Sequence, residues 1–177
     1  IEHWIVDDTT LLKSGRHSDG VAIQYSGLVG TTANGQSLVS LSLATEAVSM
    51  PVACDLYLPE DWAHDRKRRL HAGVPPHLTF RTKIEMAIDQ IRHAVAAGLP
   101  RGIVLADAAY GGARRFRDAL RDLALSYALG NESNTTVVPT ADPANGRTRS
   151  VKVQAGAVRV DGLASAWEPH HRLVARR

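Results

Sequence analysis

The sequence of 177 residues contains one cysteine, Cys54, so no disulfide bond can form within the chain. This scarcity fits a reducing compartment, and Cys54, in an alternating apolar run, is predicted to be a small core residue. No apolar run reaches the ~20 residues that a membrane-spanning helix needs. The N-terminus lacks the basic and then apolar pattern of a secretion signal. Together these absences predict a cytoplasmic protein without a membrane partner.

Several signatures of common enzyme classes are also missing. There is no Gly-x-x-x-x-Gly-Lys loop to cradle a phosphate. The serines near the N-terminus lack the nucleophile elbow of hydrolases, and the histidines lack the spacing of metal ligands. An initiator methionine is absent as well, which predicts that the chain is a fragment of a longer protein.

Basic charge, in contrast, is present and clustered. The formal net charge of +3 is compatible with binding to nucleic acid but does not prove it. Each cluster is equally compatible with a solvated helix face. The candidate DNA-binding residues are Arg66, Lys67, Arg68, Arg69, Arg114 and Arg115.

Alternation of apolar and polar side chains predicts strands in the first third of the chain. They cover residues 3–8, 21–25, 38–43 and 50–58, the last two as an antiparallel pair. In the fourth strand the apolar face consists of Val52, Cys54, Leu56 and Leu58. The charged segment 59–69 begins with acids and ends with bases, which favours one short helix.

The clearest helix begins at Thr82, which forms a capping box with Glu85. Its apolar stripe consists of Ile84, Ile88, Ile91 and Val95, and Gly98-Leu99-Pro100 ends it. Residues 110–112 are predicted to form a turn, followed by a helix whose apolar face is Phe116, Leu120 and Leu123, and by a strand at residues 125–129.

Two apolar runs each end in an acid, and they are the centre of the interpretation. The first is Trp4 to Asp8, with the strand expected to end at Asp7 and Asp8. The second is the continuous run Gly102 to Asp107, which is typical of a parallel strand buried on both faces. Neighbouring strands that end in this way place their carboxylates at one sheet edge.

The order of elements predicts an α/β domain of the ribonuclease H-like type. In this fold an antiparallel meander is followed by parallel crossover strands, and helices flank the mixed sheet. Residues 1–130 form this core, and residues 131–177 begin a β-rich insertion or an irregular tail. Within the tail, strands are predicted at residues 151–154 and 157–160, joined at Gly156.

Carboxylates gathered at a sheet edge bind Mg²⁺ or Mn²⁺, which prefer oxygen ligands. Two such metals about 4 Å apart stabilise the attacking and leaving oxygens of a phosphodiester displacement. The flanking arginines would hold the polyanionic substrate. An acid at a strand end is also common as a turn residue or a helix cap, and that reading stays open for each aspartate alone.

A series of motifs runs through residues 3–130 in a fixed order. It consists of Trp4-Ile5-Val6-Asp7-Asp8-Thr9, Lys13-x-Gly15-x-His17-Ser18-x-Gly20-Val21, Gln24-Tyr25-Ser26-Gly27, Leu56-Tyr57-Leu58-Pro59-x-x-Trp62, Ala72-Gly73-Val74-Pro75, Phe80-x-Thr82-Lys83 and Leu105-Ala106-Asp107-x-x-Tyr110-Gly111. This series resembles the catalytic domain of bacterial insertion-sequence transposases of the DDE type.

The resemblance implies cleavage of element ends and joining of the released 3′-hydroxyls to target DNA. It further implies a two-metal Mg²⁺ or Mn²⁺ site, a homodimer in the synaptic complex and a location at the bacterial nucleoid. The family's first acid maps to Asp8, with Asp7 as its neighbour, and the second maps to Asp107. The third, a glutamate beyond a β-rich insertion, has no clear match, because the late Glu168 is followed by Pro169.

Two other functions compete with this interpretation. A phosphatase with an aspartyl nucleophile usually has an acid two residues later, whereas Thr9 and Thr10 follow Asp8. A truncated or decayed transposase that binds DNA without catalysis is the stronger rival, since the third carboxylate is missing. A glutamate on a helix downstream of Arg177 would favour the enzyme.

Overall fold

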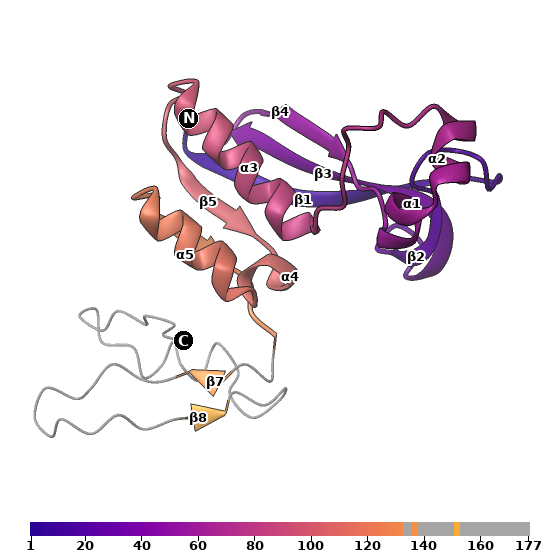
Figure 1. Ribbon diagram of the computed structural model, residues 1–177. Helices are drawn as coiled ribbons and strands as arrows, with labels where there is room; N and C mark the ends of the chain where they lie inside the picture. Colours follow the sequence, from indigo (N-terminus) through magenta and orange to yellow (C-terminus); the bar gives the residue numbers. More distant parts are fainter. Residues whose placement is uncertain (133–135, 138–150, 153–177) are drawn as a thin grey trace, which may run out of the picture. The chain divides into compact units, whose positions relative to one another are not determined.

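The computed structural model describes residues 1–132, 136–137 and 151–152 (Figure 1). The chain divides into two compact units, Ile1–Leu129 and Gly130–Arg177. In the second unit, strand β7 (Thr136–Val137) pairs antiparallel with β8 (Val151–Lys152). The first two residues of the strand predicted at 151–154 are therefore confirmed, but its partner precedes it in the chain. The strand predicted at residues 157–160 lies outside the described residues, as does Glu168.

A mixed sheet of six strands forms the first unit, which confirms the α/β class and is consistent with a ribonuclease H-like fold. Across the middle of the sheet the order is β4, β3, β1, β5, β6, with the first three antiparallel and the last three parallel. The short strand β2 pairs with the beginning of β3 instead. The strands are β1 (His3–Leu12), β2 (Ala22–Ser26), β3 (Thr31–Ala44), β4 (Ser49–Leu56), β5 (Ile103–Ala106) and β6 (Tyr127–Leu129).

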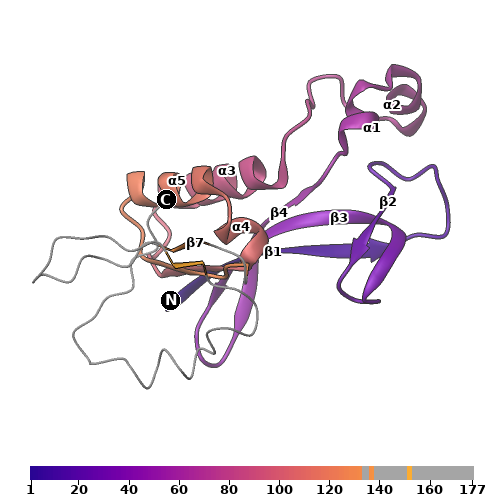
Figure 2. The same cartoon turned by 90° about the horizontal axis from the view of Figure 1, so that it is seen from below.

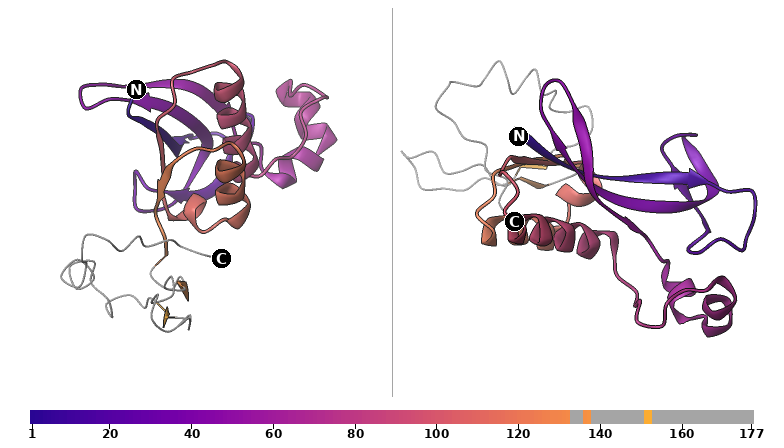
Figure 3. Two further views of the ribbon diagram at one scale, coloured as in Figure 1. Left: turned by 90° about the vertical axis from the view of Figure 1, so that its left-hand side faces the viewer. Right: turned by 90° about the horizontal axis from the view of Figure 1, so that it is seen from above.

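Two helices, α3 (Lys83–Ala96) and α5 (Arg114–Asp122), form one layer against the sheet (Figures 2 and 3). A pair of short helices, α1 (Glu60–His64) and α2 (Arg66–Ala72), lies apart from that layer beside β2 (Figure 1). Among the described residues, no helix is long and apolar enough to cross a membrane.

The core lies between the sheet and the α3–α5 layer. Trp4 of β1 and Leu41 of β3 are fully buried there, together with Ile91 of α3 and Phe116 of α5. Burial of each such side chain contributes roughly 1.5–3 kcal/mol relative to exposure. The Trp4 indole also donates a hydrogen bond of 2.9 Å to the carbonyl of Pro100. This bond ties β1 to the connection between α3 and β5.

The face of β4 that the helices cover is not the face that the sequence predicted. Cys54 is exposed, so its assignment to the core was wrong, and Val52 and Leu56 are exposed with it. Asp55 lies on the covered face instead, where its carboxylate accepts a hydrogen bond of 2.9 Å from the buried Gln90 side chain of α3. A hydrogen bond between two polar side chains therefore replaces the expected apolar contact.

Three further expectations also differ from the structure. Strand β5 is parallel to β1 as predicted, but it is not buried on both faces, because Ile103 is 43% exposed. The segment 59–69 forms two helices rather than one, since the Asp65 side chain accepts from the Arg68 amide and starts a new helix. The predicted turn at residues 110–112 overlaps a short helix, α4 (Ala108–Gly111).

The capping box of α3 is confirmed. The Thr82 hydroxyl accepts from the Glu85 amide at 3.2 Å, and the Glu85 carboxylate accepts from the Thr82 amide at 2.9 Å. Arg115 of α5 contacts the other Glu85 oxygen at 2.5 Å. Because hydrogen bonds from Thr82 and Arg115 favour the charged form, they lower the Glu85 pKa below its ordinary value of 4.5.

This lowered pKa predicts a pH dependence of stability. A carboxyl group with a lower pKa in the folded state stabilises the protein above its unfolded pKa, and that contribution is lost as the pH falls below about 4.5. The free energy of unfolding should therefore fall more steeply with acidification in the wild type than in Glu85→Gln. Urea titrations on both sides of that pH test this. Equal pH slopes in the two proteins would contradict it.

Candidate active site

Asp8 and Asp107 come to the same region through the pairing of β1 with β5. The expectation that β1 ends at Asp8 was wrong, because the strand continues to Leu12 in register with β3. It is β5 that ends here, with Ala106 opposite Val6 of β1. Asp107 follows β5 directly, so the sheet brings it and Asp8 of the neighbouring β1 to the carboxyl end of β5.

The doublet Asp7-Asp8 is divided between the two faces of the sheet, since side chains alternate along a strand. Asp8 shares the covered face with Val6, and its side chain is 22% exposed. Asp7 is exposed, and its carboxylate accepts a 2.8 Å hydrogen bond from the Asp8 amide. Of the two, only Asp8 faces the helix layer.

The Asp8 carboxylate is held by two side chains from other elements. Lys83, the first residue of α3, forms an ion pair with its Oδ2 atom. The buried Ser37 of β3 donates to the same oxygen at 3.4 Å. Lys83 was not a predicted site residue. The only signal in the sequence was its place in the Phe80-x-Thr82-Lys83 motif.

Asp107 is the N-cap of α4. Its Oδ1 atom accepts from the amides of Ala109 at 3.0 Å and Tyr110 at 3.3 Å. This is the cap reading that the sequence left open, and it fixes the orientation of the side chain. Within the described residues, the Oδ2 atom of Asp107 makes no hydrogen bond. One carboxylate oxygen is therefore committed to the helix and the other is available to a ligand.

The buried Tyr110 of α4 is influenced by the charges of both acids. The residue is 1% exposed, and its hydroxyl has no hydrogen-bond partner among the described residues. Burial raises the pKa of Tyr110 well above its ordinary range, and the charges of Asp8, Asp107 and Asp7 raise it further. Three carboxylates therefore act on one buried hydroxyl. Tyr110 was also missed as a site residue, although its motif was recognised.

The chemistry of these donors suits a hard divalent cation. Mg²⁺ is commonly held by one or two protein carboxylates, with water and substrate phosphate completing its shell. Asp8 and Asp107 supply two carboxylates from adjacent strands. In the part of the chain that the structure describes, no group of three or more His, Cys, Asp or Glu residues is arranged so that it could hold a metal ion. The described residues thus fit an oxygen-ligand site with two protein carboxylates.

In the first predicted DNA-binding cluster, two residues make contacts within the fold and two are exposed. Arg69 donates to the backbone carbonyls of Ala63, Pro75 and Leu78 at 2.9, 2.9 and 2.6 Å, which braces the connection after α2. Arg68 stacks on the Trp62 ring, 3.8 Å from its centroid. Arg66 and Lys67 are exposed.

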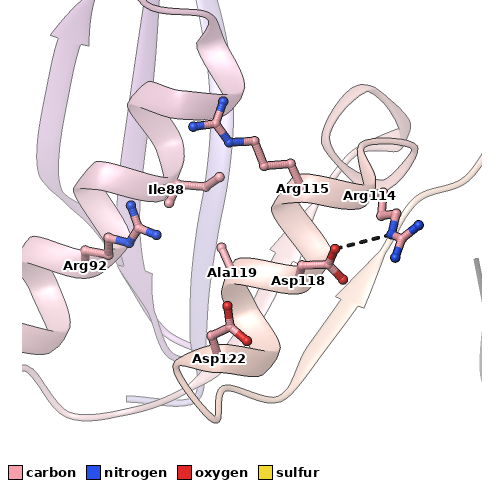
Figure 4. A pocket seen from close by; sticks show the side chains of 7 residues that line it. All are labelled: Ile88, Arg92, Arg114, Arg115, Asp118, Ala119 and Asp122. Carbon is pink, nitrogen blue, oxygen red and sulfur yellow. Dashed lines mark ion pairs between the residues drawn. The ribbon is translucent and has the colours of Figure 1, made fainter.

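The second predicted cluster lines a groove of about 370 Å³ between α3 and α5 (Figure 4). Arg92, Arg114 and Arg115 are among its lining residues, and in Figure 4 Arg115 reaches toward α3 whereas Arg114 points away from it. Arg114 pairs with Asp118 at 3.4 Å, while Arg115 reaches across to Glu85. These pairs are more than half exposed on the arginine side, so they leave the guanidinium groups accessible.

Comparison with known proteins decides the family. Residues 1–174 match the family model described as DDE superfamily endonuclease. The chain belongs to this family. The resemblance found in the motifs is thereby confirmed, and Asp8, Lys83, Asp107 and Tyr110 all lie within the matched residues.

A curated relative points the same way. The chain is 32% identical over 131 residues to the probable transposase for insertion sequence element IS701 of Microchaete diplosiphon. The match covers 73% of this chain and 32% of the relative. The chain therefore spans about a third of the length of that relative.

Proposed function

We propose that this chain is part of the catalytic core of a DNA transposase, which cleaves the ends of an insertion sequence and transfers them to target DNA. The observation that carries the proposal is the convergence of Asp8 and Asp107 at the carboxyl end of β5. Membership of the DDE endonuclease family and similarity to an insertion-sequence transposase support it.

In the proposed site, Asp8 and Asp107 hold Mg²⁺ or Mn²⁺ as a two-metal centre. Bound metals would stabilise the attacking and leaving oxygens of the phosphodiester. Ser37 orients the Asp8 carboxylate, and the amides at the start of α4 orient that of Asp107. A third carboxylate, a glutamate from a later part of the protein, would complete the ligand set. Glu168 is a poor candidate for that role, because the proline after it disfavours helical geometry at residue 168.

DNA is the proposed substrate and partner, and a homodimer the proposed synaptic form in the bacterial nucleoid. The exposed Arg66 and Lys67 are candidates for phosphate contacts, as are Arg114 and Arg115 in the groove. Arg68 and Arg69 remain in the proposed set, although each has structural contacts that its removal would disturb.

The double variant Arg66→Ala/Lys67→Ala is expected to weaken DNA binding and to reduce the salt slope of log K by about 1 for each phosphate that is no longer neutralised. Stability should hardly change, since both side chains are exposed. Fluorescence anisotropy with a duplex over a range of salt concentrations measures this. Arg69→Ala serves as the contrast, because it should lower the thermal unfolding temperature. An unchanged salt slope in the double variant would remove these two residues from the interface.

One alternative is favoured by a specific observation. Among the described residues no group of three or more His, Cys, Asp or Glu side chains could hold a metal ion. A decayed or truncated transposase that binds DNA without cleaving it is compatible with that finding. Nicking of an element-end duplex by the full-length protein, with and without Mg²⁺ or Mn²⁺, separates the two. Metal-dependent nicking supports the transposase. Duplex binding without nicking under any metal condition supports the alternative.

A further inference from the structure

Lys83 occupies an unfavourable place for a cation. It is the first residue of α3, where free amides and the helix dipole disfavour positive charge. The capping box of Thr82 and Glu85 fixes the start of the helix at this residue. Local helix chemistry therefore does not explain a lysine here, and its stabilising contacts come from other elements.

Two contacts compensate for this position. The ammonium group is paired with Asp8 Oδ2, and it lies 5.5 Å from the centroid of the Tyr57 ring. The Lys83 and Asp8 side chains are only 32% and 22% exposed, so solvent screens their attraction less than that of a surface pair. Lys83 is thus a partly shielded counter-ion of the proposed metal ligand.

We propose that Lys83 is a positioning residue that competes with a divalent metal for Asp8. Its ammonium holds the carboxylate in the metal-free protein, and it must release Oδ2 before that oxygen can bind metal. The inference rests on the proposed metal site and adds a control on its occupancy. Lysine suits an exchange of partners, because its charge lies on a flexible stem with three rotatable donors.

The proposal predicts that removal of the Lys83 charge changes stability and metal affinity in opposite directions. Asp8 and Asp107 lie at the same end of β5, and the Lys83 ammonium compensates the charge of Asp8. Removal of the Lys83 charge ends that compensation and leaves Asp8 free of its competitor. The metal-free protein should become less stable, while its affinity for metal should increase. A side chain that only supported the fold would lower both quantities.

Titration of Mn²⁺ into the full-length protein without DNA tests this. Lys83→Met is expected to bind Mn²⁺ about tenfold more tightly than the wild type, and to unfold at a lower temperature without metal. Lys83→Gln provides a second neutral variant if the first folds poorly. Lys83→Arg keeps the charge and can pair with Asp8 through two hydrogen bonds, so its affinity for Mn²⁺ should not exceed that of the wild type.

Arg81→Met is the matched control for net charge. Arg81 lies two residues away and pairs with Asp89 at 3.3 Å, so its substitution changes the charge by the same amount without touching Asp8. Its Mn²⁺ affinity should change less than about twofold. An increase equal to that of Lys83→Met would overturn the proposal, because a general change in field would then explain both.

Asp8→Asn separates failure of this inference from failure of the proposed function. If Mn²⁺ binding depends on Asp8 but the neutral Lys83 variants bind no more tightly than the wild type, the competition is refuted and the metal site stands. If Asp8→Asn leaves Mn²⁺ binding intact in every background, the proposed site is wrong and the inference falls with it.

Discussion

Asp8→Ala is expected to reduce metal-dependent nicking of an element-end duplex on the order of 10³-fold in the full-length protein. A metal ion contributes several kcal/mol to the stabilisation of transition-state charge, and about 1.4 kcal/mol corresponds to each factor of ten in rate. Asp8 is the acid of the doublet that faces the helix layer and Lys83. Single-turnover rates at saturating Mg²⁺ measure the decrease.

Asp7→Ala is the matched control, because it removes a neighbouring carboxylate of the same type. Asp7 is exposed on the other face, and its carboxylate accepts a hydrogen bond from the Asp8 amide. Its substitution should reduce the nicking rate about tenfold or less, because it changes only the orientation of the backbone at Asp8. Equal decreases in the two variants would contradict the assignment of Asp8 as the metal ligand.

Asp107→Asn should cause a decrease of the same order as Asp8→Ala while keeping the fold intact. Asparagine is as good an N-cap as aspartate, so its side-chain oxygen can still accept from the amides of Ala109 and Tyr110. The substitution therefore removes the negative charge that a metal needs but preserves the start of α4. Nicking rates and thermal unfolding are measured on the same preparation.

Asp107→Ala separates the two tasks of this side chain. It should lose nicking as Asp107→Asn does and should also lose about 1 kcal/mol of stability, the typical value of an N-cap. Wild-type nicking by Asp107→Asn would show that Asp107 is only a cap. Asp107 would then be a helix cap that does not bind metal, which is the alternative that the sequence left open.

The sheet edge itself was predictable from the sequence. A continuous apolar run before Asp107 indicated a parallel strand, and the capping box at Thr82 located the crossover helix before it. The end of β1 was not predictable in the same way. Strand β1 continues past Asp8 because β3 is long enough to pair with it as far as Leu12, and that partner is remote in sequence.

The covered face of β4 could not be predicted from the alternation of residues within the strand either. Alternation along the strand shows two faces, but the position of α3 decides which one is buried. The hydrogen bond from Gln90 to Asp55 favours the more polar face, and Cys54 is exposed as a result. A pattern within one strand carries no information about that contact.

Lys83 and Tyr110 were not predicted as site residues for a related reason. A lysine at the start of a helix is typical of a solvated surface, and a tyrosine beside two glycines is typical of a turn. Their nearness to Asp8 becomes visible only in the fold, in which α3 and α4 carry them. No group of three or more side chains that could hold a metal ion occurs among the described residues, and the proposed site therefore names two acids.

The central claim is that Asp8 and Asp107 hold a metal in common, and iron-mediated backbone cleavage tests it most directly. Fe²⁺ bound in place of Mg²⁺ reduces added H₂O₂ to hydroxide and hydroxyl radicals, with ascorbate to regenerate Fe²⁺, and the radicals cut the polypeptide near the metal. The account predicts cuts close to both residue 8 and residue 107, suppressed by excess Mg²⁺ and abolished in Asp8→Asn. Cuts at neither position, or cuts that persist unchanged in Asp8→Asn, would contradict it.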